Sequence, residues 1–482
     1  MKTSLPLHSG GYKGDSVDLS SFECVNLYPE KITGDSSKVA LIGTPGLSTL
    51  TTVGIGPHRG VIEHLGDAYF VSSNELIKYT TAGIKTTIGT LNTSAGIVSM
   101  SSNGISGGQF TITDGTNGYT CDGATVTVIN DAQYLASPTK NCFIDGYTAT
   151  VFDNTDYFML SDAYDSTSYT TTFKARGERD PDKLKNCAAN NRQLWLFGET
   201  TTEIWYNSGN TMPFDPLPNG FIEVGIHAAS SLANLGNLGL IWMAQDKKGK
   251  GQIIHALGFQ ARELTNPTIL SIWRTYSRLD DATAFTYQEA GHTFYVLTFP
   301  TANRTWVYDM TTELWHERMR GQVGRVRASS YIYFNGQHIV GDFENGNIYS
   351  MSIGTYKDNT DYILRYFTTP HVAENGETIR HNFLDLDMEM GVGLVSGQGV
   401  TPDLWMDYSD DGGHSFNNKR YASMGIGGNF SNKISWPFLG NSSNRIYRVG
   451  TSEPVKIRIN RLLLDFNMRS DYDGGRNGKS SS

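Results

Sequence analysis

Short alternating runs of hydrophobic and polar residues return at similar distances along the chain. Each copy holds an alternating strand, a polar or glycine turn, and a second alternating strand, which is typical of antiparallel hairpins with one better-buried face. The starts of successive copies are 41, 38, 46, 46, 54 and 44 residues apart. The copies begin at Ala68, Gln109, Tyr147, Gln193, Gly239, Thr293 and Gln337.

This spacing predicts a β-propeller, because four-stranded blades repeat every ~40–50 residues. Each copy supplies the two middle strands of a blade, and the segments between copies supply the inner and outer strands. The sequence therefore predicts an all-β fold with a seven-bladed propeller over residues 56–356. The alternative is a β-sandwich with hairpins in series, but so many hairpins exceed the ~7–9 strands of such a domain.

The copy "NRQLWLFGETTTEIWYNSG", residues 191–209, is predicted to be the middle hairpin of the fourth blade. Its large aromatic residues, Trp195 and Trp205, are expected to pack between neighbouring blades. Glu203 lies on the second strand, where we expect a backbone or intersubunit contact rather than chemistry.

The regions that flank the repeats have a different pattern of residues. Residues 1–55 are predicted to form an N-terminal extended arm, because Pro29 and Pro45 favour extended or turn backbone. Residues 357–469 contain further alternating runs and are predicted to form a C-terminal β-sandwich-like domain. Residues 470–482 form a polar tail without apolar side chains, expected to be disordered alone.

Composition agrees with an all-β protein. Only 18% of the 482 residues are charged and 52 are glycine, which suits a fold with many turns. The net charge of −9 argues against a protein that wraps DNA tightly, because phosphate binding needs a basic face. We see no signal peptide and no apolar run of the ~18–20 residues that a membrane helix needs, so we expect synthesis in the cytoplasm and no membrane insertion.

No pattern of residues points to catalysis, a metal or a cofactor. The four cysteines lack zinc-site spacing and are expected to be buried thiols. The stretch "SDDGGHSF", Ser409 to Phe416, fits an Asp box, which fixes a β-turn. The carboxylate pairs Asp180/Asp182 and Asp280/Asp281 lie in turn-like stretches, and a glycosidase needs two carboxylates that converge at ~5–9 Å. We therefore predict no catalytic, cofactor-binding or metal-binding residues.

Two basic clusters are the candidate contact sites for DNA or an acidic partner, because Arg grips phosphate bidentately and Lys acts as a point charge. The alternative is a solvated face or an intersubunit ion pair. The candidate residues are Arg318, Arg320, Arg325 and Arg327 in "ERMRGQVGRVR", and Lys247, Lys248 and Lys250 in "KKGKG".

Several stretches, in this order, resemble one known family. They are "VNLYPE", "GTPGL", "LWLFGETTTEIWYNSG" and the C-terminal "NRIYRVG" and "VKIRINRLLLDF". The order resembles the tail hub or nozzle proteins of short-tailed bacteriophages, also called packaged DNA stabilisation proteins. The most specific segment is Gly198 to Gly209, where Glu203 and Trp205 occupy the family's acidic and aromatic positions.

The resemblance implies a structural virion protein in a phage tail, made in the host cytoplasm and without catalysis or cofactor. It implies a homo-hexamer below the portal and adaptor, a ring that forms the DNA conduit and retains the packaged genome. It also implies contacts with tail fibres or spikes, and passage of double-stranded DNA without sequence specificity. The alternatives are a glycan-binding or glycan-cleaving β-propeller protein, against which a single Asp box argues, and an ordinary propeller interaction module.

Overall fold

The fold is described from a computed structural model, which is 54% strand and 5% helix. The described residues are 2–8, 22–32, 35–177, 182–247, 249–322, 324–374 and 376–468, so the predicted tail 470–482 lies outside them. The chain divides into two compact units. The propeller unit is Pro45–Asp361, and the sandwich unit combines Met1–Thr44 with Tyr362–Ser482. The predicted arm 1–55 is thus shared between both units.

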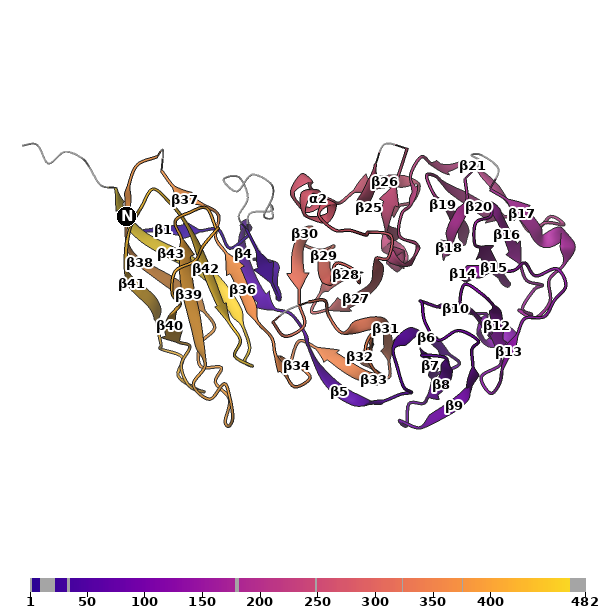
Figure 1. The fold of residues 1–482 in the computed structure, drawn as a ribbon, viewed down its shortest axis with the longest axis horizontal. Helices are drawn as coiled ribbons and strands as arrows, with labels where there is room; N and C mark the ends of the chain where they lie inside the picture. Colours follow the sequence, from indigo (N-terminus) through magenta and orange to yellow (C-terminus); the bar gives the residue numbers. More distant parts are fainter. Residues whose placement is uncertain are drawn as a thin grey trace, which may run out of the picture. The chain divides into compact units, whose positions relative to one another are not determined.

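The propeller unit is a succession of antiparallel sheets in chain order (Figure 1). The first is β6 (His58–His64), β7 (Asp67–Ser72), β8 (Glu75–Tyr79) and β9 (Lys85–Thr90). The second is β10 (Ser99–Ser102), β11 (Phe110–Thr113), β12 (Gly118–Cys121) and β13 (Val126–Val128). The third is β14 (Pro138–Ile144), β15 (Tyr147–Phe152), β16 (Tyr157–Leu160) and β17 (Lys174–Arg176). The next is β18 (Leu184–Asn190), β19 (Gln193–Gly198), β20 (Thr202–Asn207) and β21 (Phe214–Ile222).

The later sheets continue this order. One holds β22 (Gly225–Ile226), β23 (Ala233–Asn234), β24 (Leu240–Gln245), β25 (Lys250–Leu257) and β26 (Gln260–Glu263). Another holds β27 (Thr283–Glu289), β28 (His292–Phe299), β29 (Arg304–Asp309) and β30 (Leu314–Arg318). The last holds β31 (Ala328–Phe334), β32 (Gln337–Asp342), β33 (Asn347–Ser352), β5 (Gly46–Thr52), β34 (Lys357–Asp358) and β35 (Asp361–Tyr362). The short helices are α1 (Gly104–Gly107), α2 (Pro267–Arg274), η1 (Thr171–Phe173), η2 (Ala229–Ser231) and η3 (Gly236–Leu238).

The first strands of neighbouring sheets contact one another, including β6 with β10, β10 with β14 and β31 with β6. These contacts return to the first sheet, so the sheets form a ring with their first strands at the centre, the arrangement of a β-propeller (Figure 1). The all-β propeller prediction is confirmed, while the count of seven blades stays a prediction.

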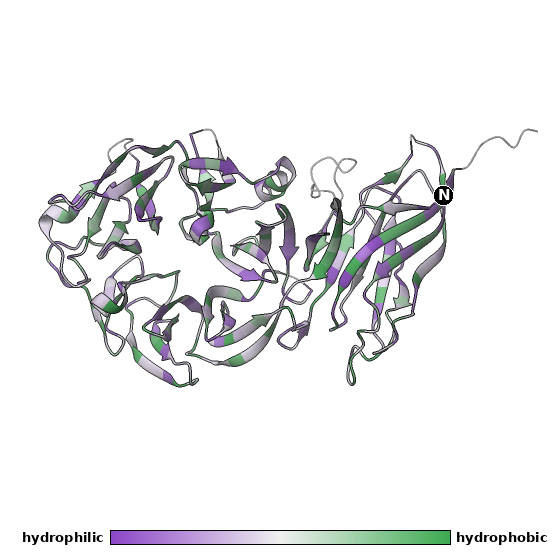
Figure 2. Ribbon diagram, turned by 180° about the vertical axis from the view of Figure 1, so that it is seen from behind, coloured by the Kyte–Doolittle hydropathy of each residue, from purple (hydrophilic) through white to green (hydrophobic). Residues whose placement is uncertain are grey.

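Apolar side chains of neighbouring sheets form the core between them, and hydrophobic and hydrophilic residues alternate along many strands (Figure 2). Trp205 packs against Phe158 of the preceding sheet, with ring centroids 5.1 Å apart. Trp195 belongs to a second cluster, which includes Trp242 of the following sheet. Both tryptophans therefore pack between blades, as the sequence predicted. Glu203 is buried and accepts a hydrogen bond from Trp205 Nε1 at 3.2 Å.

The ring closes through a strand from the N-terminal side of the repeats. β5 pairs antiparallel with β33, from Gly46 opposite Ser352 to Thr52 opposite Asn347. The last sheet thus takes one strand from the start of the unit and its other five from the end. The closing strand β5 lies outside the predicted propeller range 56–356. The sequence pattern indicates only an extended segment there.

The sandwich unit contains two sheets. One has the order β3-β4-β43-β38-β41, with β1 beside β43, and the other has the order β2-β36-β42-β39-β40, with β37 beside β42. The strands of the first are β1 (Lys2–Leu5), β3 (Leu27–Ile32), β4 (Asp35–Gly43), β38 (Ile379–Met388), β41 (Ile434–Ser442) and β43 (Arg458–Met468). Those of the second are β2 (Cys24–Val25), β36 (Arg365–Thr368), β37 (Val372–Ala373), β39 (Asp403–Ser409), β40 (Arg420–Ser423) and β42 (Asn444–Thr451). The predicted C-terminal β-sandwich is confirmed, and β1–β4 of the predicted arm belong to it.

His381 lies buried in the sandwich unit. One ring nitrogen lies 2.7 Å from the Tyr447 hydroxyl and the other 2.8 Å from Ser442 Oγ. Burial, with the nearby Arg445 charge, lowers the pKa of His381 to about 4. The folded state therefore holds this imidazole neutral where the unfolded chain protonates it.

Substitution of Gly46 tests the ring closure. A Cβ at this position would lie 2.4 Å from the carbonyl oxygens of Thr355 and Lys357, which are backbone atoms. Gly46→Ala should therefore destabilise the propeller unit by about 1–3 kcal/mol, measured as a lower melting temperature in calorimetry. Gly249→Ala is the matched control, because nothing lies within 4 Å of its added Cβ. Equal melting temperatures for both variants would contradict the closure geometry.

His381 predicts acid sensitivity of the sandwich unit. Because its folded pKa lies below the unfolded value of 6.5, stability is full above pH 6.5 and falls as the pH drops toward 4. The loss should reach about 3 kcal/mol near pH 4, since one pKa unit corresponds to ~1.4 kcal/mol. Denaturant unfolding at pH 7 and 4.5 should show a smaller pH-dependent loss in His381→Gln than in the unchanged chain. An identical loss in both proteins would contradict this assignment.

Candidate functional site

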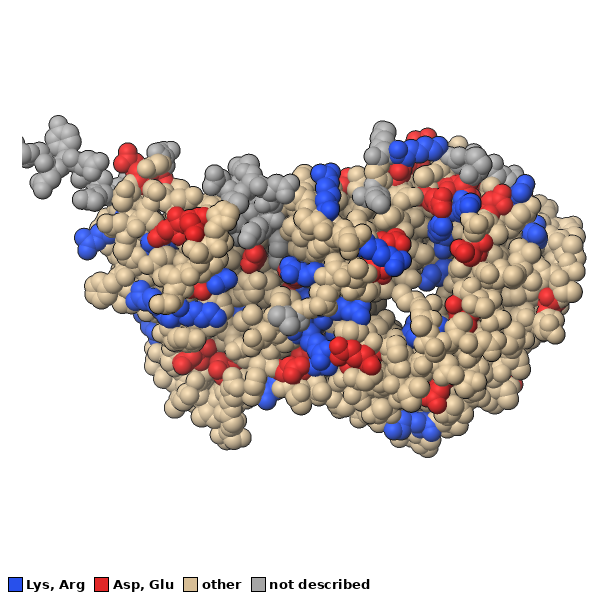
Figure 3. Space-filling model, in the orientation of Figure 1, with Lys and Arg blue, Asp and Glu red and all other residues tan. Residues whose placement is uncertain are grey.

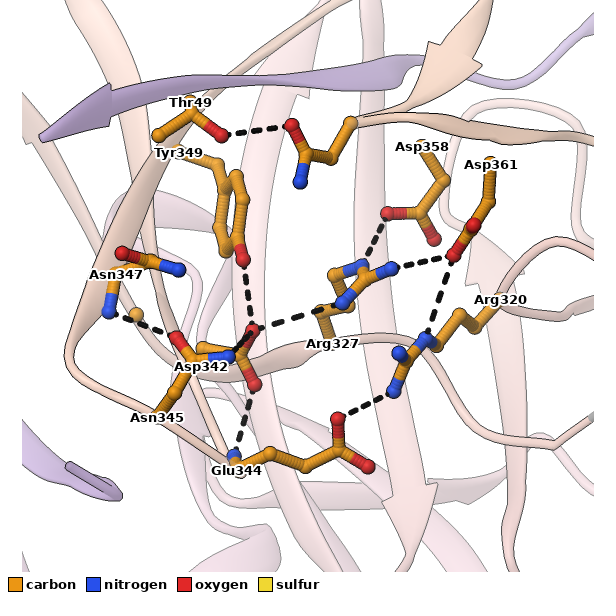
Figure 4. Close-up of polar contacts among 12 residues, drawn as sticks. Thr49, Arg320, Arg327, Asp342, Glu344, Asn345, Asn347, Tyr349, Asp358 and Asp361 are labelled. Carbon is orange, nitrogen blue, oxygen red and sulfur yellow. Dashed lines mark hydrogen bonds and ion pairs between the residues drawn. The ribbon is translucent and has the colours of Figure 1, made fainter. Parts of the chain in front are cut away.

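The predicted arginine cluster lies at the ring closure, at the end of β30 and in the segment before β31. Arg327 is buried, and its guanidinium contacts three carboxylates of the propeller unit (Figure 4). Its nitrogens lie 2.7 Å from Asp358, 2.5 Å from Asp361 and 3.8 Å from Asp342. A buried guanidinium needs such partners, since an unpaired buried charge is costly.

Asp342 also fixes the turn after β32. Its carboxylate accepts the Glu344 N–H at 2.8 Å and the Tyr349 hydroxyl at 2.8 Å, and Asn345 donates to it at 3.1 Å. Arg320 extends the network, since it lies 2.6 Å from Glu344 and 3.8 Å from Asp361 (Figure 4). The network therefore joins the segment between β30 and β31 to the turn between β32 and β33.

The same network holds the segment that contains β34. Asp358 pairs in register with Leu47 of β5, and the Asn359 N–H donates to the Leu47 carbonyl at 2.8 Å. Thr49 of β5 donates to Asn359 at 2.7 Å. Burial raises the pKa of the Asp358 carboxyl, and the Arg327 charge opposes this shift. The ion pair of Arg327 with Asp358 therefore stabilises the same segment that pairs through its backbone with the closing strand β5.

The two other predicted arginines also contact their own unit. Arg318 is buried and donates to the Pro45 carbonyl at 2.9 Å and to the Tyr287 hydroxyl at 3.4 Å. The Arg325 guanidinium lies 3.7 Å from the centre of the Phe343 ring, a cation–π contact. These contacts supply a structural role that the sequence did not reveal. Contact of the four arginines with DNA or a partner stays a prediction.

The lysine cluster lies at the hairpin between β24 and β25. Lys247 is exposed, Lys248 lies outside the described residues, and Lys250 is the first residue of β25. The structure does not bring this cluster into the arginine network. Its contact with DNA or an acidic partner also stays a prediction.

The candidate acidic pairs serve as turn and ion-pair groups. Asp182 accepts the backbone N–H groups of Glu199, Thr200 and Thr201 at 2.6–2.9 Å, while Asp180 lies outside the described residues. Asp280 pairs with Arg278 at 2.8 Å, and Asp281 accepts the Thr301 N–H at 2.8 Å. Each described carboxylate of these pairs is thus engaged in local structure.

The Asp box of the sandwich unit fixes a turn. Hydrogen bonds from the hydroxyls of Ser409 and Ser415 hold the pKa of the Asp411 carboxyl well below its usual range. Ser409 Oγ also accepts the Gly413 N–H at 2.8 Å. These bonds account for the motif, as the sequence prediction proposed.

No group of three or more potential metal-ligating side chains occurs among the described residues. The thiols are free, with Cys24, Cys121 and Cys187 buried and Cys142 half-buried. In the same part of the chain, no helix has the length and apolar character to cross a membrane.

The network makes Arg327 the most sensitive of the predicted arginines. Arg327→Met should cost about 3–5 kcal/mol, because it leaves Asp342 and Asp358 buried without their cation. Arg262→Met is the control, since its ion pair with Glu313 is exposed and such pairs contribute about 0–1 kcal/mol. Guanidinium unfolding should separate the two variants, and similar midpoints would rule out a structural role for the network.

Comparison with solved structures gives propellers of low identity. A streptogramin B lyase structure aligns with a TM-score of 0.43 and 11% identity, over 64% of this chain and 97% of that chain. A virginiamycin B lyase from Staphylococcus aureus has a TM-score of 0.42 and 11% identity, over 69% and 99%. The computationally designed Ika8 protein has a TM-score of 0.41 and 8% identity, over 63% and 100%. No curated protein matches the chain.

Two family models cover nearly the whole sequence. The model described as bacteriophage P22 Gp10, beta-propeller, matches residues 3–356. The model described as bacteriophage P22 Gp10, beta-sandwich, matches residues 364–467. The two matches agree with the two folds observed, and they confirm the resemblance noted in the sequence. The chain therefore belongs to the bacteriophage P22 Gp10 family of tail nozzle and stabilisation proteins of short-tailed phages, which are structural virion proteins.

Proposed function

We propose that this protein is one of six identical subunits of a tail nozzle, a ring below the portal and adaptor through which the phage genome leaves. In this proposal the ring retains packaged DNA until infection and contacts tail fibres or spikes. Each subunit contributes a propeller of seven blades, and the protein is made in the host cytoplasm before joining the virion. The family match over both units is the observation that carries the proposal.

The centre of the propeller supports a conduit between copies rather than within one. The Lys140 ammonium of β14 lies 3.0 Å from Ser230 Oγ of η2, so a single side chain joins first-strand regions two sheets apart. A side chain that bridges the centre in this way favours a passage for the genome between several copies around an axis over one through a single propeller.

The distribution of charge supports passage without tight binding. The chain carries a net charge of −9. On the face of the propeller unit seen in Figure 3, acidic and basic side chains are interspersed rather than segregated. Arg318 and Arg327 are buried against groups of their own unit. A neutral to acidic conduit lets DNA slide, since a continuous basic wall would bind phosphates and slow ejection.

The proposal predicts assembly on a template. Purified alone, the chain should elute as a monomer of about 53 kDa in light scattering. Mixed with phage heads that carry portal and adaptor but lack a nozzle, it should form a six-fold ring in electron micrographs and reduce leakage of packaged DNA. Heads without adaptor are the control and should bind none. Absence of a ring on complete heads, or a ring of another symmetry, would overturn the hexameric nozzle.

A further inference from the structure

The propeller unit contains a cavity of about 580 Å³ outside the arginine network. Its walls come from three neighbouring sheets, at the turn after β23, the strands β27 and β28, and the hairpin of β31 and β32. Pockets of ~300–1,000 Å³ are the usual size for small-molecule sites. All lining residues belong to one compact unit, so the cavity is formed by a single subunit.

Aromatic rings form one wall and are held in place. The Tyr331 ring stacks on Phe285 at 5.1 Å, and its hydroxyl lies 2.9 Å from His338 Nδ1. Burial raises the pKa of Tyr331 to about 12, so this hydroxyl keeps its proton at physiological pH. The Tyr333 ring also contacts His338, with ring centroids 5.1 Å apart, and Tyr333 is 57% exposed. The ordered pair Tyr331–His338 thus supports a third ring that remains accessible to a ligand.

The polar groups of the cavity include amides and hydroxyls. The lining includes Gln288, Thr286, Thr293 and Asn234, and none of the lining residues is Lys, Arg, Asp or Glu. The Asn234 side chain already has hydrogen-bond partners. It donates to the Ala189 carbonyl at 3.0 Å and accepts the Gly236 N–H at 2.8 Å. Gln288 is exposed, and its amide has no hydrogen-bond partner in the described part of the chain. The cavity therefore offers an amide that can both donate and accept.

These features select a class of ligand. A phosphate would find neither Lys nor Arg among the lining residues, which disfavours a nucleic-acid backbone as the ligand. An apolar ligand would make no hydrogen bond with the Gln288 amide. A ring with an apolar face and neutral hydroxyl groups at its edge satisfies both the aromatic wall and the amide.

We propose that this cavity binds a short neutral saccharide, with one sugar ring stacked on Tyr333 and its hydroxyl groups hydrogen-bonded to Gln288. The site is for binding only, and no bond of the saccharide is cleaved. It adds a direct contact with a neutral surface or capsule glycan to the structural role of the protein. It does not depend on hexamer formation, because one subunit contains the complete cavity.

The test uses the full chain labelled with a fluorophore on an array of neutral and anionic bacterial oligosaccharides, followed by titration of the neutral ones that bind. We expect binding to neutral spots only. Tyr333→Ala should raise Kd at least about 10-fold, and Gln288→Ala should raise it several-fold, through loss of stacking and of hydrogen bonds. Tyr421→Ala is the matched control, because this tyrosine is 66% exposed but belongs to the sandwich unit.

Three results would overturn the proposal. The first is no neutral saccharide bound by the unchanged chain. The second is an unchanged Kd in Tyr333→Ala when its melting temperature shows that it is folded. The third is tighter binding of adenosine or thymidine than of any neutral saccharide, which would make the cavity a nucleobase site. None of these results bears on ring assembly, so the nozzle proposal is tested separately.

Discussion

The propeller unit depends on the pairing of β5 with β33. A ring of sheets has no natural end, and an unpaired last sheet would leave an open edge with unsatisfied backbone groups. β5 satisfies that edge with a strand from the other end of the unit, from Gly46 opposite Ser352 to Thr52 opposite Asn347. The closure requires a residue without a side chain at position 46, because backbone carbonyls occupy the space of a Cβ.

Charge reinforces the same closure. The buried Arg327 contacts Asp342, the last residue of β32, and Asp358 and Asp361 in the chain that follows β33. Such a buried ion-pair group stabilises the fold only when all its members are present. Removing one member leaves a buried charge without compensation. A cluster that looks like a basic surface in sequence is thus a connection within the unit.

The sandwich unit shows the same use of buried polar groups. Arg445 is 1% exposed, pairs with Asp410 at 2.6 Å and lies 3.8 Å from the Tyr408 ring centre. His381 remains neutral beside it because burial and the Arg445 charge both disfavour imidazolium. Arg327 and Arg445 are thus paired with carboxylates of their own unit, whereas the buried Arg318 donates to a carbonyl and a hydroxyl. The protein thus consists of two all-β units, and its family is one of structural virion proteins.

The sequence by itself determined the fold class, the hairpin repeat, the sandwich region and the family. It could do so because alternation, turn residues and spacing are local properties. The packing of Trp195 and Trp205 between blades could be predicted from that alternation. The tertiary structure alone decided that β5 closes the ring, that β1–β4 join the sandwich unit, and that Arg318 and Arg327 are buried. Such features depend on residues far apart in the chain. Arg318, for example, contacts Pro45, and Gln288 and Tyr333 line the same cavity. Local pattern carries no information about which distant groups meet, because only packing brings them together.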